Sequence, residues 1–401
     1  MRNNYSIKYI RGTLLILGIW PDEHKLEKKF PFLCYRYFVP LALIIFLMII
    51  PQTVNLFIIY NNLVLVTENL TIANLAALLT CLKYFFVISN RKALNELLGY
   101  YKEDWKHMKG KEETEIMVRC ANISERISIT CVLFMQGAVS LKMIQQCIGI
   151  ILVEIRGLER FFVVQSWFPP FVKVTPYYHL VSITQVVTVY CVGISYTSID
   201  CLIFMLVFHI CAQFQILRRS LKQAINHRSE NSQDDGSFRE AIRIIVKKHE
   251  HLNYFAKTVE DSFNFCILLQ VLVSTLLICF QGFLVFKEIL NSESFPLNEI
   301  SFLLFYVADV ASFLYFFCYM GELLTNSSAG MRNAIFESDW QKLSSKDIKM
   351  LMFIIFRTRR PLQMTAGKFT VLSMETYSRV NITYLNFKSC SWIFVSYGTY
   401  V

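Results

Sequence analysis

Charged side chains are scarce in this chain. Asp, Glu, Lys and Arg make up 17% of its 401 residues, whereas hydrophobic residues make up 54% and aromatic residues 15%. Soluble globular domains carry about 25% charged residues, so this composition excludes an ordinary soluble globule of the same length. We therefore expect an integral membrane protein.

The usual signatures of catalytic and metal sites are missing as well. The sequence contains no glycine-rich phosphate loop, no His-Glu-x-x-His and no Cys-x-x-Cys pair. His249 and His251 are two residues apart, which places them on different faces of a helix, and we interpret them as solvated side chains. We predict that the chain is not an enzyme and holds neither a metal nor a cofactor.

The net charge of +10 does not indicate nucleic-acid binding. The basic residues lie beside apolar stretches, where contact with anionic lipid headgroups is the simpler explanation. We expect membrane lipid to be a partner and nucleic acid not to be one.

Seven apolar stretches are long enough to cross a bilayer, because a span needs about 20 residues at a rise of 1.5 Å each. They cover residues 41–60, 70–88, 127–150, 180–211, 263–286, 300–320 and 369–400. The predicted fold is thus all-α: an integral membrane bundle of seven helices. No internal repeat is visible, which weakens the alternative of a transporter built from inverted halves.

Lys and Arg alternate strongly between the segments that flank these stretches. Up to Pro361, the four segments on one side hold seven, eight, nine and seven of them, whereas those on the other side hold none, three and one. Because basic residues are retained in the cytoplasm, the pattern predicts an inverted topology, with the N-terminus inside and the C-terminus outside.

This topology suggests a domain organisation. Residues 1–40 would be a cytoplasmic N-terminus with an interfacial helix over Tyr5–Trp20, and residues 41–320 would hold six spans. Within them, the aromatic and proline-rich segment 151–180 is expected to form an outer lid loop, and the basic segment 213–260 a pair of inner helices. The charged segment 100–126 is expected to be a solvated helix that extends the third span inward.

Lys142 and Asp309 are charged residues within expected spans, where each raises the free energy unless it is paired or lies in a water-filled cavity. Both lie about 12–14 Å below the outer end of their span at helical rise. They could form an ion pair or the polar spot of an outward-facing cavity. Alternatively, Lys142 extends toward the headgroups and Asp309 bonds a neighbour such as Ser312. Nearby Met143, Phe302 and Tyr306 would suit a small apolar ligand, although packing between helices explains them equally.

Several motifs resemble those of insect odorant receptors. They are Leu17-Gly-Ile-Trp-Pro21, Trp167-Phe-Pro169, Thr175-Pro-Tyr-Tyr178 and Lys247-Lys-His249, and in the C-terminal third Cys318-Tyr-Met-Gly-Glu322, Ser327-Ser, Ala334-Ile-Phe-Glu-Ser-Asp-Trp340 and Arg360-Pro-Leu-Gln-Met-Thr-Ala-Gly-Lys-Phe369. The resemblance spans residues 10 to about 380, and its C-terminal motifs keep the family's order and spacing.

The resemblance implies the ligand-tuning subunit of an odorant-gated, non-selective cation channel. Such subunits form a tetramer with a universal odorant-receptor co-receptor, in the plasma membrane of olfactory dendrites. The family's pocket for a small volatile ligand lies in the outer half of the bundle, where the candidate residues here are Lys142, Met143, Gln146, Val189, Phe302, Tyr306 and Asp309. Residues 321–368 would be a cytoplasmic anchor between subunits, with Trp340, Pro361, Thr365, Ala366, Gly367 and Phe369 as candidates.

The chain departs from the family's pattern at its end. In the family the last helix, here 369–401, lines the pore, yet after Val380 this chain places Asn386 and Lys388 within the apolar stretch, and Arg379 precedes them. Each is expensive against lipid. Either these side chains line a wet pore or the tail does not encode the family's pore helix.

Two alternatives have different sequence requirements. A gustatory receptor would share the architecture, but its Thr-Tyr-rich final signature ending in Gln-Phe is missing. A G-protein-coupled receptor would have the opposite orientation, and the sequence has neither Asp-Arg-Tyr after the third span nor Asn-Pro-x-x-Tyr in the last.

Overall fold

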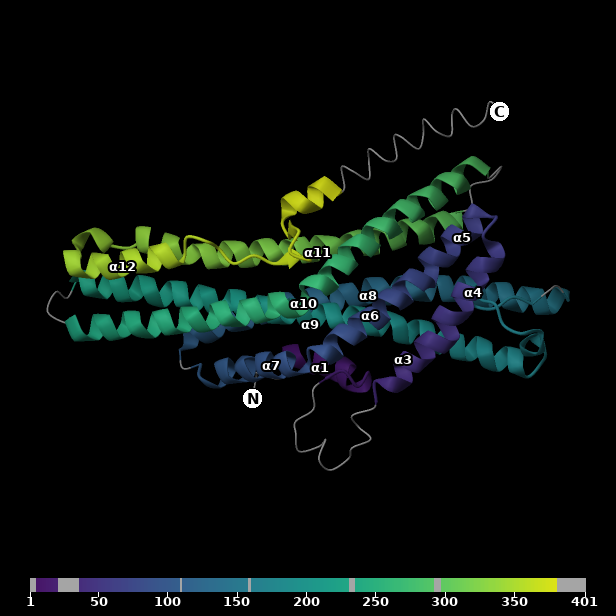
Figure 1. Cartoon of the computed structure of the whole chain (residues 1–401), viewed down its shortest axis with the longest axis horizontal. Helices are drawn as coiled ribbons and strands as arrows, with labels where there is room; N and C mark the ends of the chain where they lie inside the picture. The colour runs from purple at the N-terminus through teal and green to yellow at the C-terminus, as the bar shows by residue number, and fades with distance from the viewer. Residues whose placement is uncertain are drawn as a thin grey trace.

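The computed structural model describes residues 5–20, 36–108, 110–157, 160–230, 235–291 and 297–380. Within these ranges the chain is helical except for its loops and one small hairpin (Figure 1). The elements are α1 (Tyr5–Ile16), α3 (Phe38–Ile44), η2 (Ile45–Ile49), α4 (Ile50–Ile59), α5 (Leu63–Asn69), η3 (Leu70–Asn74), α6 (Leu75–Ser89), α7 (Arg91–Lys106), α8 (Lys111–Arg156), η4 (Pro170–Lys173), α9 (Tyr177–Glu230), α10 (Asp235–Asn291), α11 (Leu297–Phe336), η5 (Trp340–Lys342), α12 (Ser345–Arg357), β1 (Thr365–Ala366) and β2 (Thr370–Val371).

The helices match six of the seven expected spans. Five helical segments are long and apolar enough to cross a membrane within the described residues: Phe38–Ile59, Lys111–Arg156, Tyr177–Glu230, Asp235–Lys287 and Ser301–Phe336. The second expected span corresponds to η3 and the shorter apolar helix α6. Residues 374–380 begin a further helix, but most of the seventh expected span, beyond Val380, lies outside the described residues. An all-α membrane bundle is thus the fold, as the sequence predicts.

Helix α9 is the centre of the bundle. Its membrane-length window is 89% buried, far more than that of any other long helix described. Helices α8, α10, α11 and α1 pack around it. Lipid can cover apolar side chains but not polar ones, and α9 carries buried polar residues such as Gln185, Ser195 and Asp200, which explains why protein surrounds this helix.

Two π-helical turns interrupt the outer helices. The turn η2 ends just before Pro51, whose ring nitrogen cannot donate to a carbonyl one turn earlier, so the ladder is rearranged there rather than sharply broken. The second turn, η3, leads from α5 into α6. Such turns often lie at functional sites, and both contribute residues to the cavity described below.

The long helices continue beyond the apolar zone. Helices α9 and α10 extend together to one end of the molecule, where α9 ends at Glu230 and α10 begins at Asp235, in agreement with the expected pair of helices (Figure 1). The expectation for 100–126 was only partly right: residues up to Lys106 belong to α7, and α8 starts at Lys111. Nor is that start wholly solvated, because Met117 and Cys120 are buried against α9.

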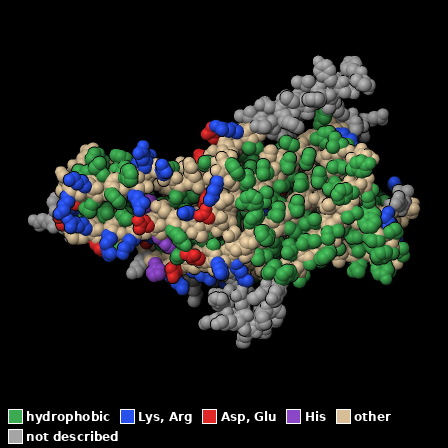
Figure 2. All heavy atoms as spheres, in the orientation of Figure 1, with side chains coloured by type: hydrophobic (Ala, Val, Ile, Leu, Met, Phe, Trp, Pro, Cys, Tyr) green, Lys and Arg blue, Asp and Glu red, His purple; other side chains and the backbone are tan. Residues whose placement is uncertain are grey.

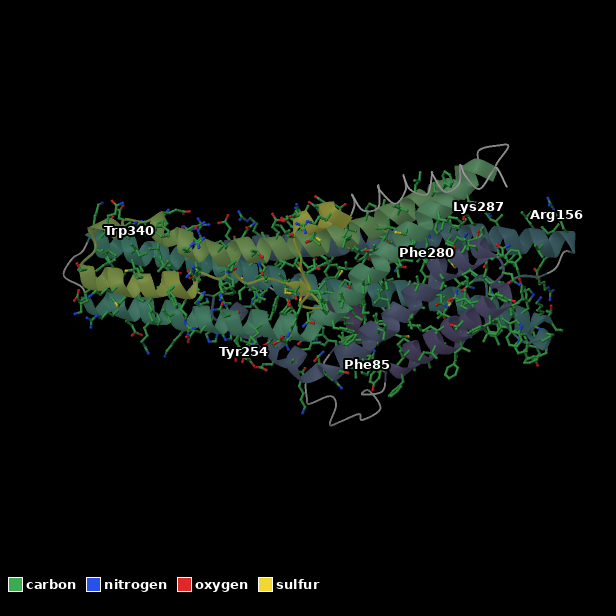
Figure 3. The ribbon with its side chains drawn as sticks, turned by 45° about the horizontal axis from the view of Figure 1, so that its top comes forward. Phe85, Arg156, Tyr254, Phe280, Lys287 and Trp340 are labelled. Atoms are coloured by element: carbon green, nitrogen blue, oxygen red, sulfur yellow. The ribbon has the colours of Figure 1, made fainter. Side chains whose placement is uncertain are left out.

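The surface divides into an apolar half and a charged half. Figure 2 shows hydrophobic side chains covering the right half of the molecule, while Lys, Arg, Asp and Glu gather on the left half with α12. Phe57, Leu133 and Leu180 are among the large apolar side chains exposed on the expected membrane spans. Trp340 and Arg156 lie at opposite ends of the long axis (Figure 3). This division is what a bilayer around one half of the bundle requires.

Helix α1 is tied into the core. Ile10 and Leu14 are fully or almost fully buried, and α1 packs against α8 and α9. Trp20 follows the helix and is buried in the same cluster. The apolar side of the expected interfacial helix is therefore covered by protein.

Candidate ligand-binding site

An apolar cavity lies between the helices on the lid side of the bundle. Its volume is about 60 Å³, and we call it the core cavity. Its walls come from η2, η3, α6, α8, α9, α10, α11 and the loop before α9; they are Met48, Ala73, Ala76, Met135, Ala138, Val139, Lys142, Met143, Val164, Val189, Val192, Gly193, Tyr196, Leu277, Phe302, Tyr306, Asp309, Val310 and Phe313. Apolar walls with a few polar groups are typical of small-molecule sites.

Six of the seven candidate pocket residues line this cavity. They are Lys142, Met143, Val189, Phe302, Tyr306 and Asp309. The seventh, Gln146, lines a neighbouring cavity of about 250 Å³, which we call the lid cavity. Lys142, Val164 and Phe302 border both spaces and so form the wall between them.

Lys142 and Asp309 share the core cavity but do not form a hydrogen-bonded pair. Lys142 Nζ lies 5.1 Å from the centre of the Phe302 ring. Both carboxylate oxygens of Asp309 are buried without a hydrogen-bond partner among the described residues. The alternative bond to Ser312 is also not made by the carboxylate, because Ser312 Oγ donates to the backbone carbonyl of Asp309. Of the interpretations open from sequence, the structure agrees with the polar spot of a cavity.

Tyr306 is fixed by a bond across the cavity wall. Its hydroxyl donates to the carbonyl of Thr71 in η3 at 3.0 Å, and its ring stacks on Phe302 with 6.0 Å between centres. The π-helical turn thus offers a backbone acceptor to α11. This bond links α11 to the second expected span at the edge of the cavity.

The segment between α8 and α9 covers the cavities as a packed lid. Val163 and Val164 are buried, and Phe162 packs on Phe168 and Tyr178. A backbone bond holds the middle of this segment against α4, since Trp167 N donates to the carbonyl of Pro51 at 3.0 Å. On the lid cavity, Gln165 Nε2 donates to Glu68 Oε2 at 3.0 Å. An aromatic loop that packs on itself matches its composition.

The sequence reasoning missed a buried ion pair beneath the core cavity. Lys83 Nζ lies 2.7 Å from each carboxylate oxygen of Asp200, and both side chains are completely buried. The same ammonium lies 3.6 Å from the ring centre of Tyr196, a residue of the cavity wall. Gln270 Nε2 donates to the hydroxyl of Tyr196, which extends the network to α10. A charged residue of each sign within an expected span was the signal that could have revealed this pair.

The candidate anchor residues lie at the charged half and the hairpin. Strands β1 and β2 pair antiparallel around Gly367, which has a φ of +61° and donates its N–H to the carbonyl of Asn264 at 2.9 Å. Thr365 is in β1 and donates its N–H to Glu260 Oε2 at 3.0 Å. Ala366 is buried, Pro361 is partly buried, and Phe369 is 85% exposed.

Trp340 lies apart from the hairpin. It begins η5, is partly buried and meets Phe336 edge to face at 6.5 Å between ring centres. The structure therefore divides the six candidates between the hairpin segment and the far end of the molecule (Figure 3).

Comparison with known proteins identifies the family. The family model described as "7tm Odorant receptor" matches residues 62–384, which is most of the chain. The chain belongs to the insect odorant receptor family. This membership confirms the expectation of a multi-pass membrane receptor rather than an enzyme.

Individual odorant receptors are distant in sequence but close in fold. Odorant receptor 13a of Drosophila melanogaster is 24% identical over 209 residues, 49% of each chain, and odorant receptor 85c of the same fly is 22% identical over 300 residues, 73% of this chain and 74% of that one. The chain thus matches only about half of the length of odorant receptor 13a. The structure of the olfactory receptor OR5 of Machilis hrabei in complex with eugenol has a TM-score of 0.80 at 14% identity, covering 96% of this chain and 97% of that one. A second structure of the same receptor also gives a TM-score of 0.80, at 16% identity.

Proposed function

We propose that this odorant receptor is the ligand-binding subunit of an odorant-gated, non-selective cation channel. Small volatile molecules would bind in the core cavity, and the chain would act together with the odorant-receptor co-receptor. The core cavity, lined by seven helical elements and covered by the lid, is the observation that carries this proposal. The similar fold of an olfactory receptor described in complex with eugenol supports it.

The cavity can transmit ligand binding to the rest of the bundle. Tyr196 and Phe313 are in its wall, and their rings also meet edge to face at 5.7 Å between centres. Tyr196 further contacts Lys83 of α6 and Gln270 of α10. A ligand that fits one arrangement of these helices better than another shifts the population toward it by its differential affinity.

The charge pattern supports an inverted orientation. The lid would face outside, and the charged half with α12 would face the cytoplasm, because that half carries the segments rich in Lys and Arg. The receptor would be in the plasma membrane of olfactory dendrites, with lipid around its apolar half.

Subunit assembly would use the charged half and the hairpin, the anchor of residues 321–368. Large apolar side chains are exposed there: Phe336, Met352, Phe353, Phe356 and Phe369 are 58–85% exposed. Burying a phenylalanine side chain is worth about 1.5–3 kcal/mol, so a partner subunit that covers them would be stabilised. Trp340 and the segment from Pro361 to Gly367 would position this surface.

The decisive experiment is the whole-cell current evoked by a broad odorant panel with G-protein signalling blocked. Cells would express this chain with the co-receptor, or either chain alone. A fast cation current only with both supports the proposal. Silence despite good surface expression would contradict it, unless a family-typical tail grafted after Val380 restores the current and so locates the defect in the tail.

The odorant receptor family match sets the two alternatives aside. A gustatory receptor would give current without the co-receptor in this assay. A G-protein-coupled receptor would lose its response when G-protein signalling is blocked.

A further inference from the structure

Asp309 is a buried acceptor without a donor. It is on α11, its side chain is completely buried, and it lines the core cavity. Neither carboxylate oxygen has a hydrogen-bond partner among the described residues. A buried polar group normally has a partner, because leaving it unsatisfied costs about 1–3 kcal/mol or more if it is charged.

The other two buried carboxylates among the described residues are satisfied. Asp200 is bonded through both oxygens to Lys83, and Asp347 accepts from Arg228 Nε at 3.0 Å. Neither lines the core cavity. Asp309 thus differs from them in two respects at once: no described residue donates to it, and it borders the core cavity.

The nearby groups explain which donor would fit. Tyr306, one turn away on α11, already donates its hydroxyl to Thr71. Most other walls are aliphatic or aromatic side chains without a polar hydrogen. A molecule in the core cavity that carries an O–H or N–H group would therefore find its acceptor at Asp309.

Lys142 disfavours a cationic donor. It borders both the core cavity and the lid cavity, and its ammonium lies 5.1 Å from the ring centre of Phe302 on the wall between them. The cavity wall already carries one positive side chain, Lys142, and one negative side chain, Asp309, so an ammonium ligand would add a net positive charge to a small apolar space. A neutral hydroxyl adds no such charge.

We propose that the core cavity selects small neutral alcohols or phenols, whose hydroxyl donates a hydrogen bond to Asp309 while the apolar part packs among the remaining walls. This specificity rests on the proposed function of the cavity as the odorant site. The volume of about 60 Å³ is below the roughly 150 Å³ of an engineered cavity that binds benzene, so the walls must move outward to admit a ligand with an aromatic ring.

The test compares matched ligands on one carbon skeleton: benzyl alcohol, benzyl methyl ether, benzaldehyde and benzylamine. Currents are recorded from cells that express the full chain with the co-receptor. A hydrogen bond to a charged group contributes about 1.5–3 kcal/mol, so the alcohol should be at least about tenfold more potent than the ether. Asp309→Leu should reduce this ratio to near one, mainly by weakening the alcohol.

Two further variants separate specificity from folding. Asp309→Leu removes an unsatisfied carboxylate in favour of an apolar side chain of similar shape, so surface expression should be unchanged. Asp309→Asn keeps the shape and an acceptor but adds a donor, and it should bring the ether and aldehyde closer to the alcohol. The control Met143→Leu changes an apolar wall at nearly constant volume and should shift alcohol and ether together.

The outcomes distinguish this inference from the function on which it rests. Currents in which the ether, aldehyde or amine matches or exceeds the alcohol, or a ratio that Asp309→Leu leaves intact, would overturn the hydroxyl specificity while the receptor function stands. Absence of current for the four ligands and for the broad panel, with the chain at the surface, would instead overturn the function.

Discussion

We expect the folded receptor to lose stability when either partner of the Lys83–Asp200 ion pair is removed. Both side chains are completely buried, and Lys83 Nζ lies 2.7 Å from Asp200 Oδ2. Replacing Lys83 with Met leaves the Asp200 carboxylate in an apolar core without its partner. Replacing both residues, Lys83→Met with Asp200→Leu, removes the uncompensated charge altogether.

The expected magnitudes follow from this geometry. Removing one partner of a buried pair costs about 3–5 kcal/mol, because the remaining charge has neither water nor a counter-ion. Lys83→Met also loses the contact with the ring of Tyr196, at 3.6 Å. Replacing a whole buried pair with apolar residues is often neutral or stabilising. The double variant should therefore be more stable than either single variant.

The assay is thermal unfolding of the purified full chain in detergent, followed alongside surface expression in cells. Each single variant should lower the unfolding temperature by several degrees and reduce surface expression, and the double variant should recover most of both. Arg243→Ala is the control: it removes an ion pair with Glu240 in which both side chains are at least half exposed, and no change is expected. Single variants as stable as the wild type, or losses that add in the double variant, would refute the reasoning.

Three other changes test the cavity and the hairpin. Tyr306→Ala removes both a wall residue of the core cavity and the bond to Thr71, so it should alter ligand potency more than surface expression. Tyr306→Phe keeps the ring in the wall and should alter potency less. Equal loss of expression and potency in Tyr306→Ala would contradict the place of Tyr306 in the site. Gly367→Ala should destabilise the protein by more than about 1 kcal/mol in thermal unfolding, because φ is +61° and the added Cβ would lie 2.4 Å from Leu268 Cδ2. The control Gly99→Ala adds a methyl group to a helix where nothing lies within contact distance, and it should be neutral or stabilising. Burial raises the pKa of the Glu260 carboxyl above its usual value, and the hydrogen bonds from Thr365 oppose this shift. Because the folded state favours the protonated form, the stability of the protein should fall as the pH rises through the folded pKa. Glu260→Gln should flatten this decline in unfolding temperature, and an unchanged pH profile would show that Glu260 is not its source.

The sequence predicts the bundle well because a bilayer imposes a simple length requirement on apolar segments. Six expected spans coincide with described helices or helical segments. Which helix lies in the centre is harder to predict, since α9 and its neighbours all have high mean hydropathy, and only packing shows that α9 is covered on every side. The length of α9 is also hard to predict from the sequence, because no break separates its apolar part from the charged part of the same helix that follows.

Depth along a span located the cavity but not the contacts within it. Lys142 and Asp309 were expected at equal depth, and both line the core cavity. Depth says nothing about the direction in which a long side chain extends, and Lys142 lies over Phe302 while Asp309 accepts no bond from it. The Lys83–Asp200 pair was harder still. Measured from the expected inner ends of their spans, the two residues differ in depth by about 9 Å at helical rise, although the structure joins them.

The contrast between two buried aspartates separates structural from ligand-binding roles in this receptor. Asp200 and Asp309 are both completely buried within apolar helices, and sequence alone assigns them the same cost. Lys83 satisfies Asp200 inside the protein, so its removal should damage folding. The carboxylate of Asp309 faces a cavity without a protein donor, so an apolar replacement should leave folding intact and change only which molecules bind. A charge that the protein itself does not satisfy is retained at the expense of stability, and in a receptor the group that satisfies it is expected to be the ligand.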